Sequence, residues 1–351
     1  MSGHLVGTRW VSGRPLTSTV WMLACLVGAL LTAACSDSES APQNVDLVLV
    51  AYDSFPTEGT SFNEALAEFG ASTGINVRVV SAGDTGTMIA KAALTAGNPE
   101  GDVMWGVDNT YLAAAQQAEI FVGDPVQVDF GDVCVNYDIA ALQQLGVDPP
   151  VSLADLVDPR FAGRLVVQNP ATSSPGLAFL LATVAEFGDD PSGGWRTYWQ
   201  QLVANDVEVV DSWDVAYYER FSGSGGGDKP LVVSYGSSPP AEVVFADPPR
   251  LDAPTGVAAG TCFRQMEYAG VLRGTDHPAQ AAQLVEFLLS ERFQRELPLN
   301  LFVYPVDSSV PLPKVFTDFA VVPDAPLSIP ADDIEANRER WLDEWTQLVL
   351  R

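Results

Sequence analysis

Residues 45–80, VDLVLVAYDSFPTEGTSFNEALAEFGASTGINVRVV, contain the pattern that decides the fold. The β-branched run Val45–Tyr52 predicts a buried strand, and Phe62–Ser72 predicts a helix with one apolar face. Ile75–Val80 predicts the next strand. Because strands that alternate with helices are typical of parallel sheets, this stretch indicates an α/β protein.

The same alternation continues along the chain. Further strands are expected at Asp102–Val107 and Leu165–Gln168, and further helices at Thr87–Ala96, Tyr111–Ala118, Gly176–Phe187, Gly194–Val203 and Ile334–Leu350. In the last of these helices, Trp341 and Trp345 recur at helical spacing and are expected in the core.

Two strand-like runs stand apart from these units. Val133–Tyr137 and Cys262–Tyr268 each join one cluster of elements to another, so we expect crossover strands between two lobes. The predicted first lobe comprises residues 45–132 and 263–300, and the second comprises 133–262 and 301–351.

The N-terminus has the features of a lipoprotein signal. A basic stretch, Met1–Arg14, precedes the apolar run Trp21–Ala34, which is shorter than the roughly 20 residues of a spanning helix. Small residues lead directly to Cys35, although Thr32 occupies the position where Leu is usual. We expect residues 1–34 to be a signal peptide and 35–44 a lipidated linker attached through Cys35. A transmembrane anchor is the alternative.

The remaining cysteines fit an oxidising compartment. Cys25 lies in the signal and Cys35 would carry lipid, which leaves Cys134 and Cys262 for the folded part. Outside the cytoplasm, one disulfide is expected rather than two free thiols. Such a bridge contributes about 4 kcal/mol in the chain-entropy treatment of a long loop.

The chain is strongly acidic, with 45 Asp and Glu against 18 Lys and Arg and a formal net charge of -27. Binding of nucleic acid, or of anionic membrane surfaces, depends on basic patches, so neither is expected as a partner. A cationic ligand would be attracted. Acidity that simply keeps an extracytoplasmic protein soluble is the other interpretation.

Catalytic machinery is sparse in the sequence. Beyond the signal the one histidine is His277, in a predicted turn, and the chain has no Gly-x-Ser-x-Gly, His-Glu-x-x-His or Ser-x-x-Lys motif. The glycine-rich segment Ser222–Asp228 lacks the ending of a phosphate-binding loop and is expected to be a surface loop. We therefore expect a protein without catalytic residues, bound metal or cofactor, and not an enzyme.

Polar and aromatic groups follow the predicted strands, where α/β lobes bind ligands. Three such segments fall in each predicted lobe, which favours a cleft between them. They are Tyr52–Phe55, Ala82–Gly86, Gly106–Thr110, Asn169–Gly176, Asp211–Asp214 and Ser234–Pro239.

Several stretches, in this order, resemble the thiamine-binding solute-binding proteins of bacterial ABC transporters over essentially the whole mature length. They are Tyr52–Phe55, Asp102–Asn109, Pro170–Leu177, Trp213 with Ala216 and Tyr217, Ser234–Tyr235 with Ser238–Pro239, Tyr304–Val306, and Trp341 with Trp345. The resemblance implies a type II periplasmic-binding-protein fold. In this fold each lobe is a mixed, mostly parallel sheet flanked by helices.

The resemblance also implies a binding site. Tyr52, Asp84, Trp213 and Tyr235 would line a thiamine site, and Ser173 would lie near any phosphate. Flat aromatic faces suit the cationic thiazolium, and a carboxylate such as Asp84 would serve as an acceptor or counter-charge. The adjacent hydroxyls give a predicted phosphate site at a helix N-terminus, formed by Thr172, Ser173 and Ser174.

The chain departs from the family at two positions. Phe302 stands where a tryptophan precedes the Tyr304–Val306 stretch, and Ala241 replaces a second aromatic residue. Phe302 retains a ring that can stack, whereas the loss at Ala241 bears on affinity and on phosphate preference.

The expected protein is a lipid-anchored, monomeric receptor outside the cytoplasm, in a periplasm or on the outer face of the membrane. It would capture thiamine, thiamine monophosphate or thiamine diphosphate by hinge closure and deliver it to a membrane permease. One alternative is a receptor of the same fold for ferric iron, since Tyr217 and Tyr218 could supply phenolates; helix packing also explains that pair. An extracytoplasmic enzyme and a purely structural lipoprotein are more distant alternatives.

Overall fold

The computed structural model describes residues 44–83, 85–223 and 226–351. The predicted signal peptide, Cys35, most of the linker and Asp84 therefore lie outside the described residues. Among the described residues, no helix combines the length and the apolar character needed to cross a membrane.

The first elements follow the predicted alternation. They are β1 (Val45–Ala51), α1 (Ser61–Thr73), β2 (Ile75–Ser81), α2 (Thr85–Leu94), β3 (Val103–Asp108) and α3 (Leu112–Gln117). β1 pairs in parallel with both β2 and β3. Thr60 caps the start of α1, and Gly74 ends it in the left-handed conformation that glycine adopts without strain.

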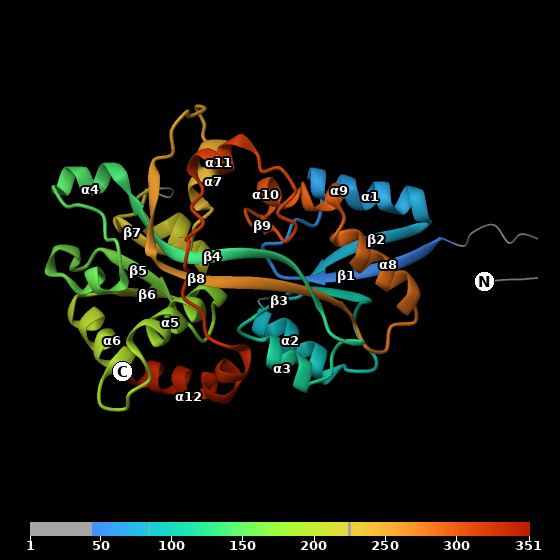
Figure 1. Ribbon diagram of the computed structural model, residues 1–351, viewed down its shortest axis with the longest axis horizontal. Helices are drawn as coiled ribbons and strands as arrows, with labels where there is room; N and C mark the ends of the chain where they lie inside the picture. The colour runs from blue at the N-terminus through green and yellow to red at the C-terminus, as the bar shows by residue number, and fades with distance from the viewer. Residues whose placement is uncertain (1–43, 84, 224–225) are drawn as a thin grey trace, which may run out of the picture. The chain divides into compact units, whose positions relative to one another are not determined.

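Two long strands dominate the centre of the sheet, β4 (Val126–Asp138) and β8 (Thr255–Val271), as Figure 1 shows. They pair with each other in antiparallel register, and both extend well beyond the runs predicted from the sequence. The prediction found only the run Val133–Tyr137 of β4 and the run Cys262–Tyr268 of β8. The rest of β4 contains polar residues and the rest of β8 is rich in Gly and Ala, and pairing between the two strands keeps these parts extended.

The sheet is continuous and mixed, with the order β2-β1-β3-β8-β4-β7-β5-β6, and β9 pairs with β4. The separate sheets expected for the two lobes are thus joined through β8 and β4. The remaining strands are β5 (Leu165–Gln168), β6 (Glu208–Val210), β7 (Leu231–Tyr235) and β9 (Tyr304–Pro305). The lobe boundaries themselves stay a prediction.

The remaining helices cover the sheet. They are α4 (Ile139–Leu145), α5 (Ser174–Phe187), α6 (Gly194–Ala204), α7 (Ser238–Val244), α8 (Pro278–Leu288), α9 (Glu291–Gln294), α10 (Leu297–Asn300), α11 (Lys314–Phe319) and α12 (Ala331–Val349). Short 3-10 turns occupy Leu153–Val157 and Pro159–Phe161, and a π-helical turn occupies Val215–Arg220.

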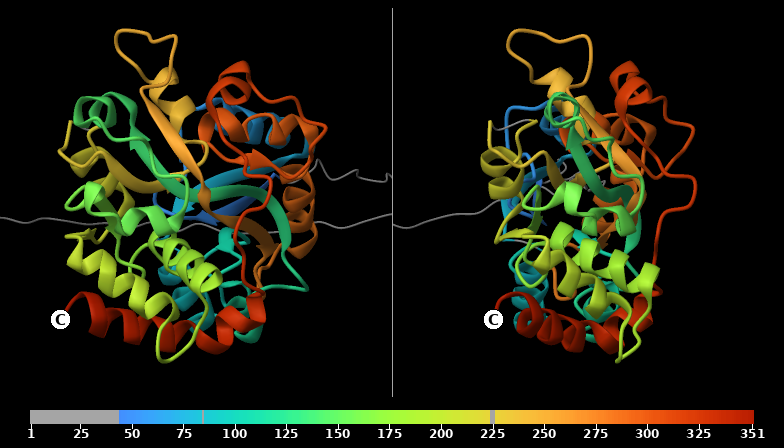
Figure 2. Two further views of the ribbon diagram at one scale, coloured as in Figure 1. Left: turned by 60° about the vertical axis from the view of Figure 1, so that its left-hand side comes forward. Right: turned by 90° about the vertical axis from the view of Figure 1, so that its left-hand side faces the viewer.

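The largest apolar cluster lies where α12 packs on α6, and Figure 2 shows α12 (red) along the side formed by α5 and α6. Trp345 meets Trp199 edge to face at 5.3 Å, and both are fully buried. Trp341 is buried as well, so both predicted core tryptophans are confirmed. Burying one such side chain contributes about 1.5–3 kcal/mol.

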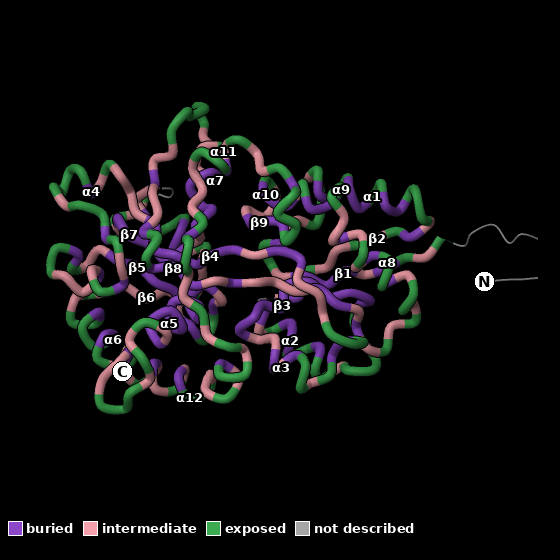
Figure 3. The backbone as a smooth tube through the Cα atoms, viewed as in Figure 1, coloured by how far each residue is buried: buried purple, intermediate pink, exposed green. Residues whose placement is uncertain are grey.

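A second cluster packs β1 and β3 against α1 and α8, around Trp105 and Phe62. In Figure 3 the buried backbone follows β1, β3 and β7. Every residue of β3 is buried. Strand β3, which carries the predicted ligand-binding segment Gly106–Thr110, is therefore packed on both faces.

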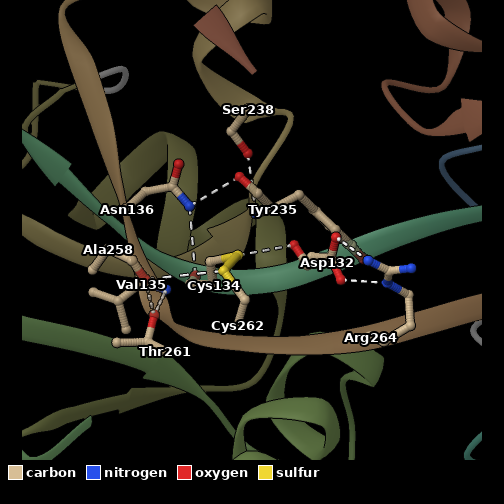
Figure 4. The surroundings of a disulfide bond; sticks show 10 residues. All are labelled: Asp132, Cys134, Val135, Asn136, Tyr235, Ser238, Ala258, Thr261, Cys262 and Arg264. Carbon is tan, nitrogen blue, oxygen red and sulfur yellow. Dashed lines mark hydrogen bonds and ion pairs between the residues drawn. A yellow bond between two sulfur atoms is a disulfide. The ribbon is translucent and has the colours of Figure 1, made fainter. Parts of the chain in front are cut away.

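A disulfide joins the central strands. Cys134 of β4 is bonded to Cys262 of β8 across 128 residues of sequence, as expected (Figure 4). On the same two strands, Arg264 pairs with the buried Asp132, with Nε 2.6 Å from Oδ1. These links hold β4 and β8 in register at the middle of the sheet.

Candidate functional site

A cavity of about 920 Å³ lies among loops that follow the strands. Its lining comes from the end of β1, the N-terminus of α5, the segments around residues 212–218 and 235–250, strand β8 and the turn at 300–303. This volume falls in the usual range for sites that enclose a small organic molecule.

Four aromatic side chains form one side of the cavity, called here the aromatic wall: Trp213, Tyr217, Tyr218 and Tyr235. Trp213 stacks on Tyr217 with ring centroids 4.9 Å apart and planes 14° from parallel. Its Nε1–H donates to Ser234 Oγ at 3.0 Å, which fixes the orientation of the indole. Tyr235 lies 6.5 Å from Trp213, centroid to centroid.

Tyr52 enters the cavity from the end of β1, and Gly106 makes room for its ring. Gly106 has φ +110°, and a Cβ at that position would lie 2.4 Å from Tyr52 Cδ1. Only glycine tolerates both the backbone angle and the close approach. Burial, followed by the nearby charge of Glu267, raises the pKa of Tyr52 well above its ordinary value.

Three carboxylates from adjacent strands form a cluster next to the cavity, called here the acidic floor: Asp108 of β3, Glu267 of β8 and Asp129 of β4. Glu267 is the register partner of Asp108 on one side and of Asp129 on the other. Residues directly opposite each other in antiparallel strands share a face, so the three side chains lie together. Glu267 itself lines the cavity.

Some oxygen atoms of the acidic floor accept hydrogen bonds from neighbouring groups, and others have no partner. Asp108 accepts from the backbone N–H of Thr110 at 2.8 Å and from Gln265 Nε2 at 3.2 Å. Asp129 Oδ2 accepts from Trp105 Nε1 at 3.1 Å. Within the described residues, Asp129 Oδ1, Glu267 Oε2 and Gln265 Oε1 are buried and have no hydrogen-bond partner.

These surroundings favour protonated carboxyl groups. Burial raises the pKa of Asp129 to about 7. Burial, and then the charges of Asp129 and Asp108, raise the pKa of Glu267 well above its ordinary value. Burial also raises the pKa of Asp108, against the opposing effect of its hydrogen bonds from Thr110.

The sequence prediction missed the floor. Asp108 was noted only as part of a loop after a strand, and neither Asp129 nor Glu267 was singled out. No spacing in the sequence brings these residues together, because the strand register alone does so. The signal that could have found Glu267 is a carboxylate inside the predicted strand Cys262–Tyr268, whereas Asp129 lies in β4 outside the predicted run Val133–Tyr137.

The structure brings most of the predicted ligand-binding residues to the cavity. Tyr52, Trp213, Tyr235 and Phe302 all line it, as does Ser174. Asp84 lies outside the described residues.

The other two members of the predicted phosphate site do not line the cavity. Thr172 is exposed, and its hydroxyl donates to the Asp211 carbonyl oxygen at 2.7 Å. Ser173 is buried, and the backbone N–H groups of both residues donate to the Asn169 carbonyl oxygen. Helix α5 begins at Ser174, two residues before the predicted start. Of the three predicted phosphate-site residues, Ser174 is thus the one that lines the cavity.

The two positions that depart from the family both line the cavity, Ala241 on α7 and Phe302 in the turn before β9. Phe302 has φ +53°, which is unusual for a non-glycine residue, and its carbonyl oxygen accepts from the Ser237 hydroxyl. Its ring lies 5.5 Å from that of Phe245, centroid to centroid. Phe302 therefore supplies an aromatic ring to the lining of the cavity, close to both ends of α7.

The charged lining residues are mostly acidic. Asp53, Asp214, Glu242 and Asp247 add to Glu267, and among the described lining residues the one base is Arg250. This composition favours a cation over a multiply charged anion.

Tyr217 and Tyr218 have roles in packing. Tyr217 is nearly fully buried, and its hydroxyl donates to Glu242 Oε1 at 2.9 Å. Tyr218 meets Trp213 edge to face at 5.3 Å. Across the described part of the chain, no group of three or more His, Cys, Asp or Glu side chains is arranged to hold a metal ion.

Relatives with similar sequences bind solutes. The chain is 28% identical to the thiamine-binding periplasmic protein of Salmonella typhimurium, over 87% of this chain and 94% of that protein. It is 25% identical to iron uptake protein A1 of Synechocystis, over 84% of this chain and 86% of that protein.

A solved structure described as a periplasmic thiamin binding protein superposes with a TM-score of 0.76. It is 27% identical and covers 87% of this chain and 96% of its own. The predicted type II periplasmic-binding-protein fold is thus confirmed. The role of the chain is to bind a solute outside the cytoplasm rather than to catalyse a reaction.

The family model described as bacterial extracellular solute-binding protein matches residues 57–297, which include most of the cavity lining. The chain therefore belongs to the bacterial extracellular solute-binding protein family.

Proposed function

We propose that this protein binds thiamine and delivers it to the permease of an ABC importer. The observation that carries the proposal is one cavity lined both by the aromatic wall and by Glu267 of the acidic floor. Relatives named as thiamine-binding proteins, similar over most of their length, support the same ligand.

The chemistry of thiamine suits this cavity. Its thiazolium ring is a permanent cation, and its aminopyrimidine is flat and carries N–H donors. Trp213, Tyr235 and Tyr52 offer ring faces, and a desolvated cation over such a face gains up to about 2 kcal/mol. Glu267 and Gln265 offer acceptors to a donor or cation.

Thiamine monophosphate and diphosphate are proposed as weaker ligands. Ser174 at the start of α5 and Arg250 at the edge of the cavity would be the groups nearest to a phosphate. The acidic lining opposes the added negative charge. Free thiamine is therefore the ligand to test first.

In the proposed transport cycle, the protein captures thiamine by closing its two predicted lobes around it. In the proposed cycle the monomer is held at the membrane by lipid on Cys35, and the two predicted lobes close on the ligand. Contacts from both sides of the cavity stabilise the closed form, which the permease then recognises.

The test is isothermal titration calorimetry of the purified protein after removal of carried-over ligand. We expect thiamine to bind with a dissociation constant below about 1 µM, which corresponds to about -8 kcal/mol. A folded protein that gives no heat with thiamine at several temperatures would contradict the proposal.

Ferric iron is the second candidate, because Tyr217 and Tyr218 lie in the cavity wall and one relative is an iron uptake protein. Paired phenolates bound to iron(III) produce a visible absorption band. The appearance of that band after loading with ferric citrate, together with no thiamine binding, would favour iron.

A further inference from the structure

Two side chains of β8 face the cavity with hydrogen-bonding capacity to spare. Gln265 is 4% exposed, and while its Nε2 donates to Asp108, its Oε1 has no partner within the described residues. Glu267 Oε2 is buried and likewise without a partner there. An unpaired buried acceptor is destabilising, and a ligand that supplies a donor or a cation removes that penalty.

The surroundings of Glu267 contain no neutralising cation in contact. The ionisable groups that face it are Tyr52 after β1, Asp108 on β3, Asp129 on β4 and Tyr235 on β7. Within the described residues, none of the three floor carboxylates forms an ion pair with Lys, Arg or His; Arg338 of α12 acts on Asp108 from farther away. Neighbouring buried carboxylates without a cation retain a proton.

We propose that Glu267, with Gln265 beside it, is the counter-charge for the ligand's ring cation, and that binding releases a proton from the acidic floor. The inference rests on the proposed function and adds to it the residues that bind the ring cation and the release of a proton on binding. The proton leaves the Glu267–Asp129 pair for the solvent, and the positive charge of the ligand takes its place.

The expected consequence is an affinity that rises with pH. The raised pKa values of Asp129 and Glu267 mean that the ligand-free floor holds a proton near neutral pH. A cation lowers those pKa values in the complex. Where one proton leaves per ligand bound, affinity increases by up to about tenfold per pH unit, and it levels off once the ligand-free floor has already lost that proton.

The experiment counts protons directly. Thiamine is titrated into the full protein by calorimetry near pH 7, in buffers that differ in ionisation enthalpy, so that the heat reports the protons released. Glu267→Gln removes the charge and keeps the size. Asp214→Asn is the matched control, because Asp214 is a carboxylate of the same cavity that is exposed to solvent.

For the parent protein and Asp214→Asn we expect release of between about one half and one proton per thiamine. Glu267→Gln should release less than about one fifth of a proton and bind roughly 10- to 100-fold more weakly. Titration of the aminopyrimidine ring of thiamine itself is common to all three proteins and cancels in the comparison.

The possible failures are distinct. Thiamine binding without proton release in the parent protein overturns this inference and leaves the proposed function standing; this result does not depend on whether Glu267→Gln folds. Equal proton release by parent and Glu267→Gln overturns the role of Glu267. Absence of thiamine binding at every pH overturns the proposed function and the inference together.

Discussion

The aromatic wall and the acidic floor, which reaches the cavity through Glu267, are built in different ways. The wall draws on residues 213–235, which are close together in the sequence and fixed by local contacts such as Trp213 on Tyr217. The floor draws on β3, β4 and β8, and even Gln265 and Asp108, which touch, are 157 residues apart. Local sequence thus encodes the aromatic surface proposed to bind a flat ring, whereas strand register encodes the acidic surface proposed to bind its charge.

Removal of the disulfide should have the largest effect, and it tests how the floor is held. The double substitution Cys134→Ser and Cys262→Ser should lower the free energy of unfolding by about 4 kcal/mol, because it frees a loop of 128 residues in the unfolded chain. Urea denaturation of parent and variant measures this difference. The parent in reductant should match the variant, and a change below about 1 kcal/mol would contradict the expectation.

The wall should dominate affinity. Trp213→Ala removes the ring that stacks on Tyr217 and faces the cavity, so we expect thiamine affinity to fall roughly 100-fold, or about 2–3 kcal/mol. Calorimetry measures it. Trp213→Phe is the control, because it retains a flat face while losing the hydrogen bond to Ser234. A dissociation constant for Trp213→Ala within about threefold of the parent would remove Trp213 from the site.

In the absence of ligand, Asp129 of the acidic floor should lower the free energy of unfolding as the pH rises toward neutral. Since burial raises the pKa of Asp129 to about 7, the folded protein retains a proton that the unfolded chain releases above about pH 4. The contribution of this group to stability is therefore complete below about pH 4, falls as pH rises to about 7, and then stays level.

Asp129→Asn should abolish the loss of stability with rising pH, because the amide does not titrate. Its carbonyl oxygen can still accept the hydrogen bond from Trp105 Nε1. Its melting temperature relative to the ligand-free parent should increase between about pH 5 and pH 7, by a few degrees in total. Differential scanning calorimetry across this range is the measurement, with Asp214→Asn as an exposed control. A melting-temperature difference that does not change with pH would show that Asp129 is not a buried, protonated acid.

The smallest expected effect on affinity concerns Ser174, a lining residue that belongs neither to the aromatic wall nor to the acidic floor. Ser174→Ala should reduce affinity for thiamine monophosphate about fivefold, since a hydrogen bond to a charged group is worth about 1 kcal/mol or somewhat more. Thiamine affinity should stay within about twofold of the parent. Thr172→Ala is the matched control, because Thr172 does not line the cavity. Equal losses in the two variants would place the phosphate elsewhere.

The sequence was sufficient to predict the parts of the molecule that local pattern encodes. Strand β5 was predicted at its observed bounds, and Trp341 and Trp345 were placed in the core. The pairing of Cys134 with Cys262 was predicted because the compartment is oxidising and these two cysteines remain for the folded part. Of the predicted site residues that are described, Tyr52, Trp213, Tyr235, Phe302 and Ser174 meet at one cavity, and whether they bind ligand stays a prediction.

What the sequence could not give depends on long-range pairing. The polar part of β4 and the Gly- and Ala-rich ends of β8 have weak strand propensity on their own, and their pairing along the sheet makes them strands. The same pairing sets Glu267 opposite both Asp108 and Asp129. Thr172 and Ser173 differed from expectation because the turn at Asn169 takes up their backbone donors.

Helix α12 has a mechanical consequence for any closing motion. It packs on α6 through Trp345, and it reaches α3 through Arg338, whose guanidinium lies 4.7 Å from the Tyr111 ring centroid and donates to the Thr110 carbonyl oxygen at 2.9 Å. Burial raises the pKa of Asp108, and the charge of Arg338 partly opposes that rise. A rotation that separates α3 from α6 must break one of these attachments, so α12 acts as a brace. If the contacts of Arg338 break during closure, its positive charge moves away from Asp108. The pKa of Asp108 then rises further, so a movement of α12 changes the tendency of the acidic floor to hold a proton.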